Sequence, residues 1–268
     1  MYFSGGGKEA EDFQNTMIQQ EIQRQTPEDA KYYQAIQQAG GFGPFHLKIM
    51  NGDSRELNDF FEKSHLNFVD ETSSLEKQAI TDCPRLFPPE DRGLRKVGRQ
   101  LSMIDSIGRP QNAQIWYPPK PQSLYSRVAC QQQVGAMGQT GDQGGHLIGY
   151  TLSGYNKRAN MVPQNGNFNT GYWRVIEGYI RECMNSKSAT SVHPVLYRVG
   201  VAYPNNTTVR PDRFTLTLHK YKIVLGITTP VPEYTILAVF QNQPQGGPNG
   251  PVFAANLRAD LRSKNFCL

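Results

Sequence analysis

The sequence predicts an α+β fold, in which a mostly helical N-terminal region precedes an antiparallel sheet and one long amphipathic helix. Helical patterns with capping residues dominate the stretch before residue 66. From Cys83 onward, short β-branched and aromatic runs are separated by Gly, Pro and Asn, which is typical of strands and turns. Apolar residues then recur every three to four positions within 167–184, which indicates a single amphipathic helix.

Charge divides the chain into two parts. Residues 1–82 carry a net charge of −7, whereas residues 83–268 carry +12, and the proline-rich CPRLFPPEDRG begins at the change. We therefore predict an acidic, mostly helical accessory region over 1–82 and a basic domain over 83–268. An excess of this size attracts polyanions such as nucleic acid, although a basic surface can also serve solubility alone.

The helical patterns of the first part occur in a clear order. Residues 11–23 form a polar pattern with sparse apolar positions, although the glutamine-rich stretch is equally compatible with partial disorder. In the next pattern Thr26 is the expected cap, Pro27 opens the helix and Gly40 ends it. Further helices are predicted over 53–65 and 73–80.

The second part carries the strand patterns. A short strand is expected at Gln114–Tyr117, and the clearest runs lie at Val195–Tyr203, Phe214–Ile227 and Tyr234–Gln241. The glycine- and proline-rich stretch 241–253 reads as a loop, and a short segment over 257–266 closes the chain.

Several classes of protein are excluded or made improbable. No apolar run approaches the roughly 20 residues that span a bilayer, so no membrane partner is expected. The first residues lack the features of a signal peptide, so export would need another route or a leader outside this sequence. Four widely spaced cysteines without a C-x-x-C pair make a zinc site improbable, and they leave two disulfides and buried thiols equally open.

Several polar residues that could take part in catalysis or metal binding lie in an otherwise glycine-rich and apolar stretch, residues 141–183. His146 follows two glycines, and Asn160, Asn169 and Glu177 come after it. Asn169 lies nine residues after Asn160, and Glu177 lies eight residues after Asn169. Asn169, Trp173, Glu177 and Arg181 recur every four residues and so share one side of the predicted helix. Taken singly, these residues read as a packed histidine, a helix cap and an i,i+4 ion pair.

Taken together, three elements resemble the DNA/RNA non-specific endonuclease family with a ββα-metal active site, in particular its bacterial toxin branch. They are DQGGH at Asp142–His146, NMVPQ at Asn160–Gln164 and NTGYWRVIE at Asn169–Glu177. Their order and spacing match the family pattern over about 40 residues. The resemblance implies a ββα-metal nuclease core in the second part and does not cover the first 80 residues.

The resemblance also implies roles for the residues of the motif. His146 would be the general base, Asn169 would hold a Mg²⁺ ion, for which Mn²⁺ can substitute, and Glu177 would orient metal-bound water. Arg181 would face the phosphate, while Asn160 would hold the loop or bond near the site. Asn160, Asp142, Arg158 and Arg213 are assigned to substrate binding or structural support.

One departure from the family pattern concerns phosphate binding. Many members have an arginine directly before the G-H pair, where this chain has Gln143 and Gly144. We expect Arg181, together with Arg158 or Arg213, to supply that charge.

These expectations define a function. The chain is expected to be a Mg²⁺-dependent endonuclease that hydrolyses DNA, with RNA as a further candidate substrate, because such enzymes contact phosphates and not base edges. It would be a secreted or delivered toxin or effector, for which a cognate inhibitor protein is a candidate partner. The alternative is a catalytically weak, nuclease-like module that binds nucleic acid or a protein.

Overall fold

A computed structural model describes residues 1–71, 83–117, 130–186, 193–223, 231–263 and 266–267. The strands are β1 (Tyr2–Gly6), β2 (Phe68–Asp70), β3 (Gly93–Val97), β4 (Gln100–Ile104), β5 (Pro110–Tyr117), β6 (Asp142–His146), β7 (Met161–Asn165), β8 (Val195–Ala202), β9 (Arg213–Lys222) and β10 (Val231–Gln241). The helices are α1 (Lys8–Arg24), α2 (Pro27–Gln38), α3 (Phe42–Asn51), α4 (Ser54–Ser64), α5 (Cys130–Ala136), α6 (Gly166–Phe168), α7 (Arg174–Ser186) and α8 (Gly250–Ser263).

One large sheet forms the centre of the molecule. Its eight strands follow the order β1-β10-β9-β8-β5-β4-β3-β2, and every neighbouring pair except β2 and β3 is antiparallel. The two outermost strands, β1 and β2, both come from the first 71 residues. The N-terminal region therefore completes the sheet at both of its edges.

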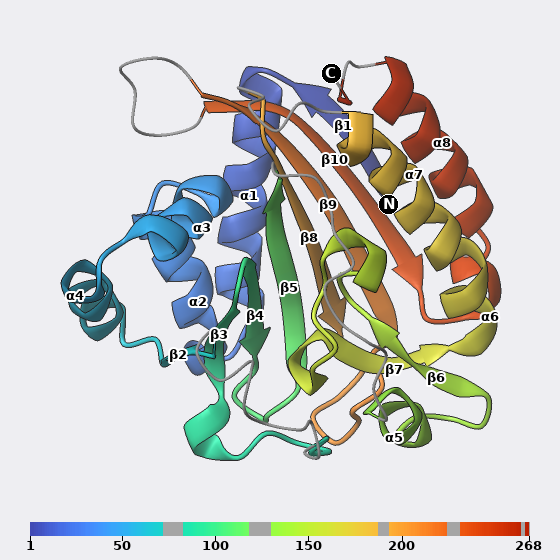
Figure 1. Cartoon of the computed structure of the whole chain (residues 1–268), viewed down its shortest axis with the longest axis horizontal. Helices are drawn as coiled ribbons and strands as arrows, with labels where there is room; N and C mark the ends of the chain where they lie inside the picture. Colours follow the sequence, from blue (N-terminus) through green and yellow to red (C-terminus); the bar gives the residue numbers. More distant parts are fainter. Residues whose placement is uncertain (72–82, 118–129, 187–192, 224–230, 264–265, 268) are drawn as a thin grey trace.

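Helices cover the two faces of this sheet. Helices α1 to α3, drawn in blue, lie on one side, and α7 and α8 lie on the other (Figure 1). Alternate residues along each strand point to opposite faces, so the sheet contributes to two separate apolar clusters. On β8, for example, Tyr197 belongs to the cluster under α7 and α8, whereas Leu196 belongs to the cluster under the N-terminal helices.

The predicted class is confirmed: the fold is α+β, with a large, mainly antiparallel sheet, an amphipathic helix and a mostly helical N-terminal region. The division at residue 82 stays a prediction. Residues from both predicted parts share one core cluster, in which Tyr32 and Ile36 of α2 pack with Leu94, Trp116 and Leu196 of the sheet.

Local sequence signals explain most of the N-terminal helices. The Thr26 side chain accepts a hydrogen bond from the Asp29 amide, and Pro27 is the first residue of α2, as the capping pattern predicts. Asp53 caps α4 in the same way. The pattern analysis missed α3, which carries a proline near its start, and the helix predicted over 73–80 lies outside the described residues.

The strand predictions are confirmed in part, with different ends. Strands β5, β8, β9 and β10 coincide with the four predicted runs, although the far end of the run Phe214–Ile227 falls outside the described residues. β1, β3 and β4 were not predicted. Helix α8 begins at Gly250, inside the stretch that was read as a loop, and it is longer than the predicted closing segment.

The prediction of one unbroken helix over 167–184 is wrong. The segment consists of α6, a π-helical turn over Asn169–Trp173 and then α7, because the backbone leaves helical values at Gly171 (φ −95°, ψ −109°). Such irregular turns often occur at functional sites. As a result, Asn169 precedes the break, whereas Glu177 and Arg181 lie on α7.

Both cysteine pairs form disulfides, which answers the question that the sequence left open. Cys83 is joined to Cys130 and Cys183 to Cys267. The first bond ties the start of α5 to the residues that lead into β3, and the second ties α7 to the C-terminal end. Disulfides of this kind persist in oxidising environments. Among the described residues, no helix is long and apolar enough to cross a bilayer.

Candidate active site

A cleft of about 970 Å³ opens where the hairpin of β6 and β7 meets the segment from α6 to α7. Helix α5 forms its opposite wall. The charged and polar residues that line it include Gln131, Asp142, Gln143, His146, Asn169, Arg174, Glu177 and Arg181. The cleft thus brings together His146, Asn169, Glu177 and Arg181, as the motif predicts.

His146 is the last residue of β6, and its ring lies between two amide side chains. Nε2 lies 2.6 Å from Oδ1 of Asn156, which can only accept, so Nε2 carries the proton. Nδ1 lies 3.4 Å from the Gln131 Nε2 group, which donates to it. The neutral ring therefore has its lone pair on Nδ1. His146 is 9% exposed and lines the cleft.

The glycines before His146 permit close packing of α5 against β6. A Cβ atom at Gly144 would lie 2.3 Å from the carbonyl oxygen of Gln131, which is closer than side chains tolerate. An arginine at this position, as in many members of the resembled family, would therefore clash with α5. The close packing of α5 on β6 therefore explains why position 144 is a glycine and not an arginine.

Asn169 lies on the π-helical turn and is half-buried at the cleft. Its side-chain Nδ2 group donates a hydrogen bond of 2.9 Å to Oε1 of Gln143 on β6. The bond links the hairpin to the helical segment at the floor of the site.

Glu177 lies on the first turn of α7, beneath the loop after β6. A Cβ atom at Gly149 would lie 2.4 Å from its Oε1, so a larger residue there would displace the Glu177 carboxyl from its present position. Burial raises the pKa of the Glu177 carboxyl to about 8, against the opposing effects of the Trp173 indole and the Arg181 guanidinium. Oε1 is buried and has no hydrogen-bond partner among the described residues.

The available oxygen ligands fit a hydrated, hard cation better than a softer metal. Within the described ranges, no group of three or more His, Cys, Asp or Glu side chains is arranged to hold a metal ion. The Asp142 carboxylate at the cleft is already bonded to Arg210 and to the Gln139 backbone amide, whereas the Asn169 amide oxygen and the Glu177 carboxyl are oxygen groups of the motif that face the same cleft. Mg²⁺ commonly binds through one or two such groups and several waters. The cleft therefore fits a Mg²⁺ ion that keeps most of its water ligands.

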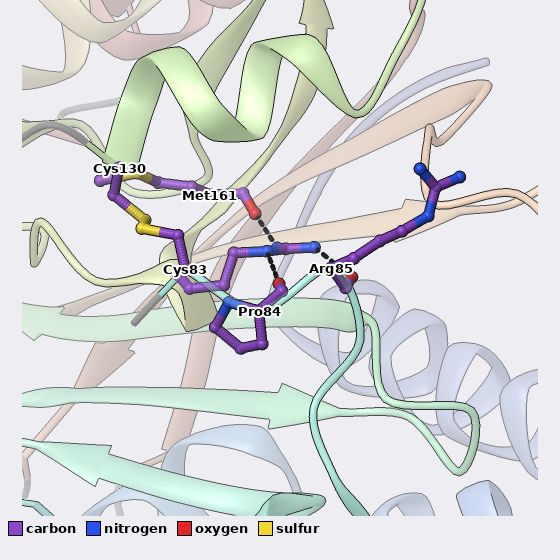
Figure 2. Close-up of a disulfide and its surroundings, with 6 residues drawn as sticks. Cys83, Pro84, Arg85, Cys130 and Met161 are labelled. Atoms are coloured by element: carbon purple, nitrogen blue, oxygen red, sulfur yellow. Dashed lines mark hydrogen bonds between the residues drawn. A yellow bond between two sulfur atoms is a disulfide. The ribbon is translucent and has the colours of Figure 1, made fainter. Parts of the chain in front are cut away.

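Asn160 and Arg158 support the site without lining the cleft. The Asn160 amide bonds to the backbone of Ile148 and Tyr155, so it holds the loop that follows β6. The buried Arg158 guanidinium donates to the carbonyls of Pro84, Arg85 and Met161, which lie beside the Cys83–Cys130 disulfide in Figure 2.

This placement does not suit the phosphate-binding role expected of Arg158. Its donors are directed at backbone carbonyls inside the protein and not at the cleft. Arg213 is half-exposed at the start of β9 and pairs with Asp212, and it does not belong to the lining of the cleft. Of the three arginines proposed to supply the charge, the cleft contains only Arg181.

Asp142 has a structural environment. Its carboxylate accepts hydrogen bonds from the backbone amide of Gln139 and from the Arg210 side chain, whose Nε atom lies at 2.6 Å. Of the two roles expected for Asp142, these contacts match structural support, since they anchor the start of β6.

Four cleft or support residues were missed by the sequence analysis. They are Gln131, Gln143, Asn156 and Arg174. Arg174 is exposed and, like Arg181, makes no ion pair within the described part of the chain. Its position three residues before Glu177 on the predicted helix was the one available signal, whereas nothing local marks the three amides.

Two antiparallel strands, the first of which ends in a buried histidine, are followed by a helical segment with an asparagine and a glutamate, and this order of elements is a ββα arrangement. In agreement, residues 94–222, just under half of the chain, match the family model for DNA/RNA non-specific endonuclease. The match supports a domain of this family in that part of the chain. Among curated proteins, no match was found.

Solved structures give weaker similarities. NucA from Streptococcus agalactiae with no metal bound is 18% identical, with a TM-score of 0.36 over 50% of this chain and 68% of that one. NucA with magnesium ion bound is 16% identical, with a TM-score of 0.37 over 70% and 90%. A chain described as an extracellular endonuclease is 13% identical, with a TM-score of 0.39 over 64% and 85%. All three TM-scores lie below 0.5.

Proposed function

We propose that this chain is a metal-dependent, non-specific endonuclease that hydrolyses phosphodiester bonds of DNA and also of RNA. The observation that carries the proposal is the shared cleft: His146, Asn169 and Glu177 line it together, and they belong to the segment that matches the family model. Two arginines at the same cleft, Arg174 and Arg181, supply positive charge for the phosphate.

His146 acts as the general base. A water molecule attacks the phosphorus atom, and Nδ1 of His146 takes the proton that this water loses. For this step the attacking water replaces Gln131, whose contact with Nδ1 is already long at 3.4 Å. Asn156 accepts the hydrogen bond from Nε2, which keeps the lone pair on Nδ1 and stabilises the imidazolium that forms.

Asn169, through its amide oxygen, and Glu177, through water, would hold the divalent cation. When bound, Mg²⁺ or Mn²⁺ would stabilise negative charge on the phosphate and make a coordinated water more acidic, so that it can protonate the leaving oxygen. The buried Oε1 of Glu177 lacks a protein partner among the described residues, which suits a group whose partner is a water of hydration.

An enzyme that contacts only the phosphates of its substrate would not distinguish one base or one sugar from another. The positive charge at the cleft comes from exposed side chains on α7, and such contacts carry no sequence information. This supports a non-specific enzyme.

We further propose a secreted or delivered toxin or effector, held in check by a cognate inhibitor protein in the producing cell. The two disulfides support exposure to an oxidising environment. An acidic inhibitor would complement the +12 charge of residues 83–268.

A plasmid-nicking assay tests the proposal. The full chain should nick plasmid with Mg²⁺ and stop with EDTA, and His146→Ala should lose about 100-fold or more of the activity, because a general base contributes that much. Thermal unfolding of the variant serves as the folding control. A His146→Ala variant that keeps more than about a tenth of the activity would refute the assignment. A wild-type chain that binds DNA without nicking it would instead favour the weak, nuclease-like module.

A further inference from the structure

Gln143 and Asn169 form a contact between the two halves of the candidate site. Gln143 is exposed on β6, and Asn169 lies 26 residues later on the π-helical turn. The bond runs from Asn169 Nδ2 to Gln143 Oε1 at 2.9 Å, and both residues line the cleft. Neither the motif nor the general-base chemistry uses Gln143.

The direction of this bond has a chemical consequence. An asparagine amide has an oxygen end and a nitrogen end of nearly equal size, and a half-turn about its last side-chain bond exchanges them. Only the oxygen can bind a cation. An acceptor that holds the nitrogen end therefore selects the orientation in which Oδ1 is left for a metal.

We propose that Gln143 is a positioning residue for Asn169, which holds its amide so that Oδ1 faces the divalent cation. The inference rests on the proposed function, since it takes Asn169 as the metal ligand. It also assigns a role to a residue of DQGGH next to the glycine that replaces the usual arginine. Arginine and lysine are donors, so either one at position 143 could not hold the Asn169 nitrogen.

The exposure of Gln143 makes the proposal testable without damage to the fold. Gln143 makes no contribution to either apolar cluster, and substitutions at exposed positions of this kind usually change stability very little. Gln143→Leu removes the acceptor at similar size. Gln143→Glu keeps an acceptor in the same place and has no donor.

The experiment measures Mn²⁺ binding to the full chain by titration calorimetry, with thermal unfolding as the control for folding. Asn169→Ala should abolish binding. Gln143→Leu should weaken it about 10-fold, since residues that orient a metal ligand typically contribute 10- to 100-fold to affinity. Gln143→Glu should bind at least as tightly as the wild type. The double variant Gln143→Glu with Asn169→Ala should not bind, which excludes direct ligation by the new carboxylate.

Three results would overturn the inference, and they are distinguishable. Equal affinity of Gln143→Leu and the wild type would show that the contact does not position Asn169. Weaker binding by Gln143→Glu than by Gln143→Leu would mean that the bond runs the other way. Unchanged binding by Asn169→Ala would remove Asn169 as the ligand and would overturn this part of the proposed function together with the inference.

Discussion

The two faces of the central sheet differ in chemistry. The face under α7 and α8 is mainly apolar, and the strands contribute to it side chains such as Val199, Leu216 and Ile236. The face under the N-terminal helices also buries polar side chains from the same strands, which are Asn112, Gln114, Arg198, Thr217, His219 and Thr235. The cleft is built beside the apolar face, from the hairpin and α7.

On the polar face, the N-terminal helices supply some of the hydrogen-bond partners. Tyr32 donates to Asn112, Arg198 donates to the Tyr33 hydroxyl, and Gln14 donates to Thr235. Burying polar groups is costly unless they are paired, so this face depends on the layer that covers it. The N-terminal helices therefore have a structural role, because they cover this face and pair with its polar side chains.

The largest effect of a single substitution is expected from truncating one apolar side chain in each layer. Ile36→Ala on α2 and Ile180→Ala on α7 should each destabilise the chain by about 2–5 kcal/mol, because both residues are completely buried. The chain has two tryptophans, and they lie on opposite sides: Trp116 in the N-terminal cluster and Trp173 in the other.

Unfolding followed through each tryptophan, in Trp116→Phe and Trp173→Phe backgrounds, shows whether the layers unfold together. We expect both signals to shift together in both variants. A shift of the Trp116 signal alone in Ile36→Ala would mean that residues 1–82 are a separable part, as the charge pattern predicts.

The next largest effect concerns the two disulfides, which form a matched pair. Replacing either pair by serine should cost about 2–4 kcal/mol of stability. Only Cys83→Ser with Cys130→Ser should also lower nuclease turnover, by about 10-fold, because Cys130 begins α5, which forms one wall of the cleft and packs against the strand that ends in His146. Cys183→Ser with Cys267→Ser is the control. Equal turnover in the two variants would show that the Cys83–Cys130 bond does not hold the wall of the cleft.

Acid should destabilise the chain through the polar face. Burial lowers the pKa values of His46 and His219 to about 3, and nearby arginines, Arg99 for the first and Arg198 for the second, add to this effect. The unfolded chain takes up a proton at each histidine below about pH 6.5, whereas the folded chain does not do so until about pH 3.

Stability should therefore fall as the pH decreases through this window, by about 1.4 kcal/mol per pH unit for each histidine. Denaturant unfolding between pH 7 and pH 4 measures the slope. The double variant His46→Gln with His219→Gln should have a shallower slope at similar stability near pH 7. An unchanged slope would show that other groups control the acid response.

The smallest effect is expected at the rim of the cleft. Arg174→Gln and Arg181→Gln should each weaken DNA binding several-fold and reduce the slope of log K against log salt by about 0.9, the value for one phosphate contact. Arg55→Gln on the exposed side of α4 is a control with the same charge change. If Arg55→Gln and Arg181→Gln had the same effect, the loss would reflect net charge and not the cleft.

The elements that depend on local chemistry could be predicted from the residues alone. Thr26 and Pro27 predict the start of α2, because a capping side chain and the restricted φ of proline stabilise the first helical turn without any distant contact. The strands β8 to β10 follow from runs of apolar residues. The prediction that His146, Asn169 and Glu177 form one active site came from the resemblance of their motif, and all three residues line the cleft. These signals need only neighbours along the chain.

Only the tertiary structure decided which amides surround the candidate site. Asn156 and Gln131 reach His146 from different segments, and Gln143 meets Asn169 across a gap of 26 residues. No periodicity marks such contacts, because each depends on how a loop and a short helix are carried past β6. The same holds for Arg158. Its charge suggested a phosphate contact, but in the folded chain its guanidinium donates to three backbone carbonyls. A side chain's type is set by the sequence, but its partners are set by which segments pack together.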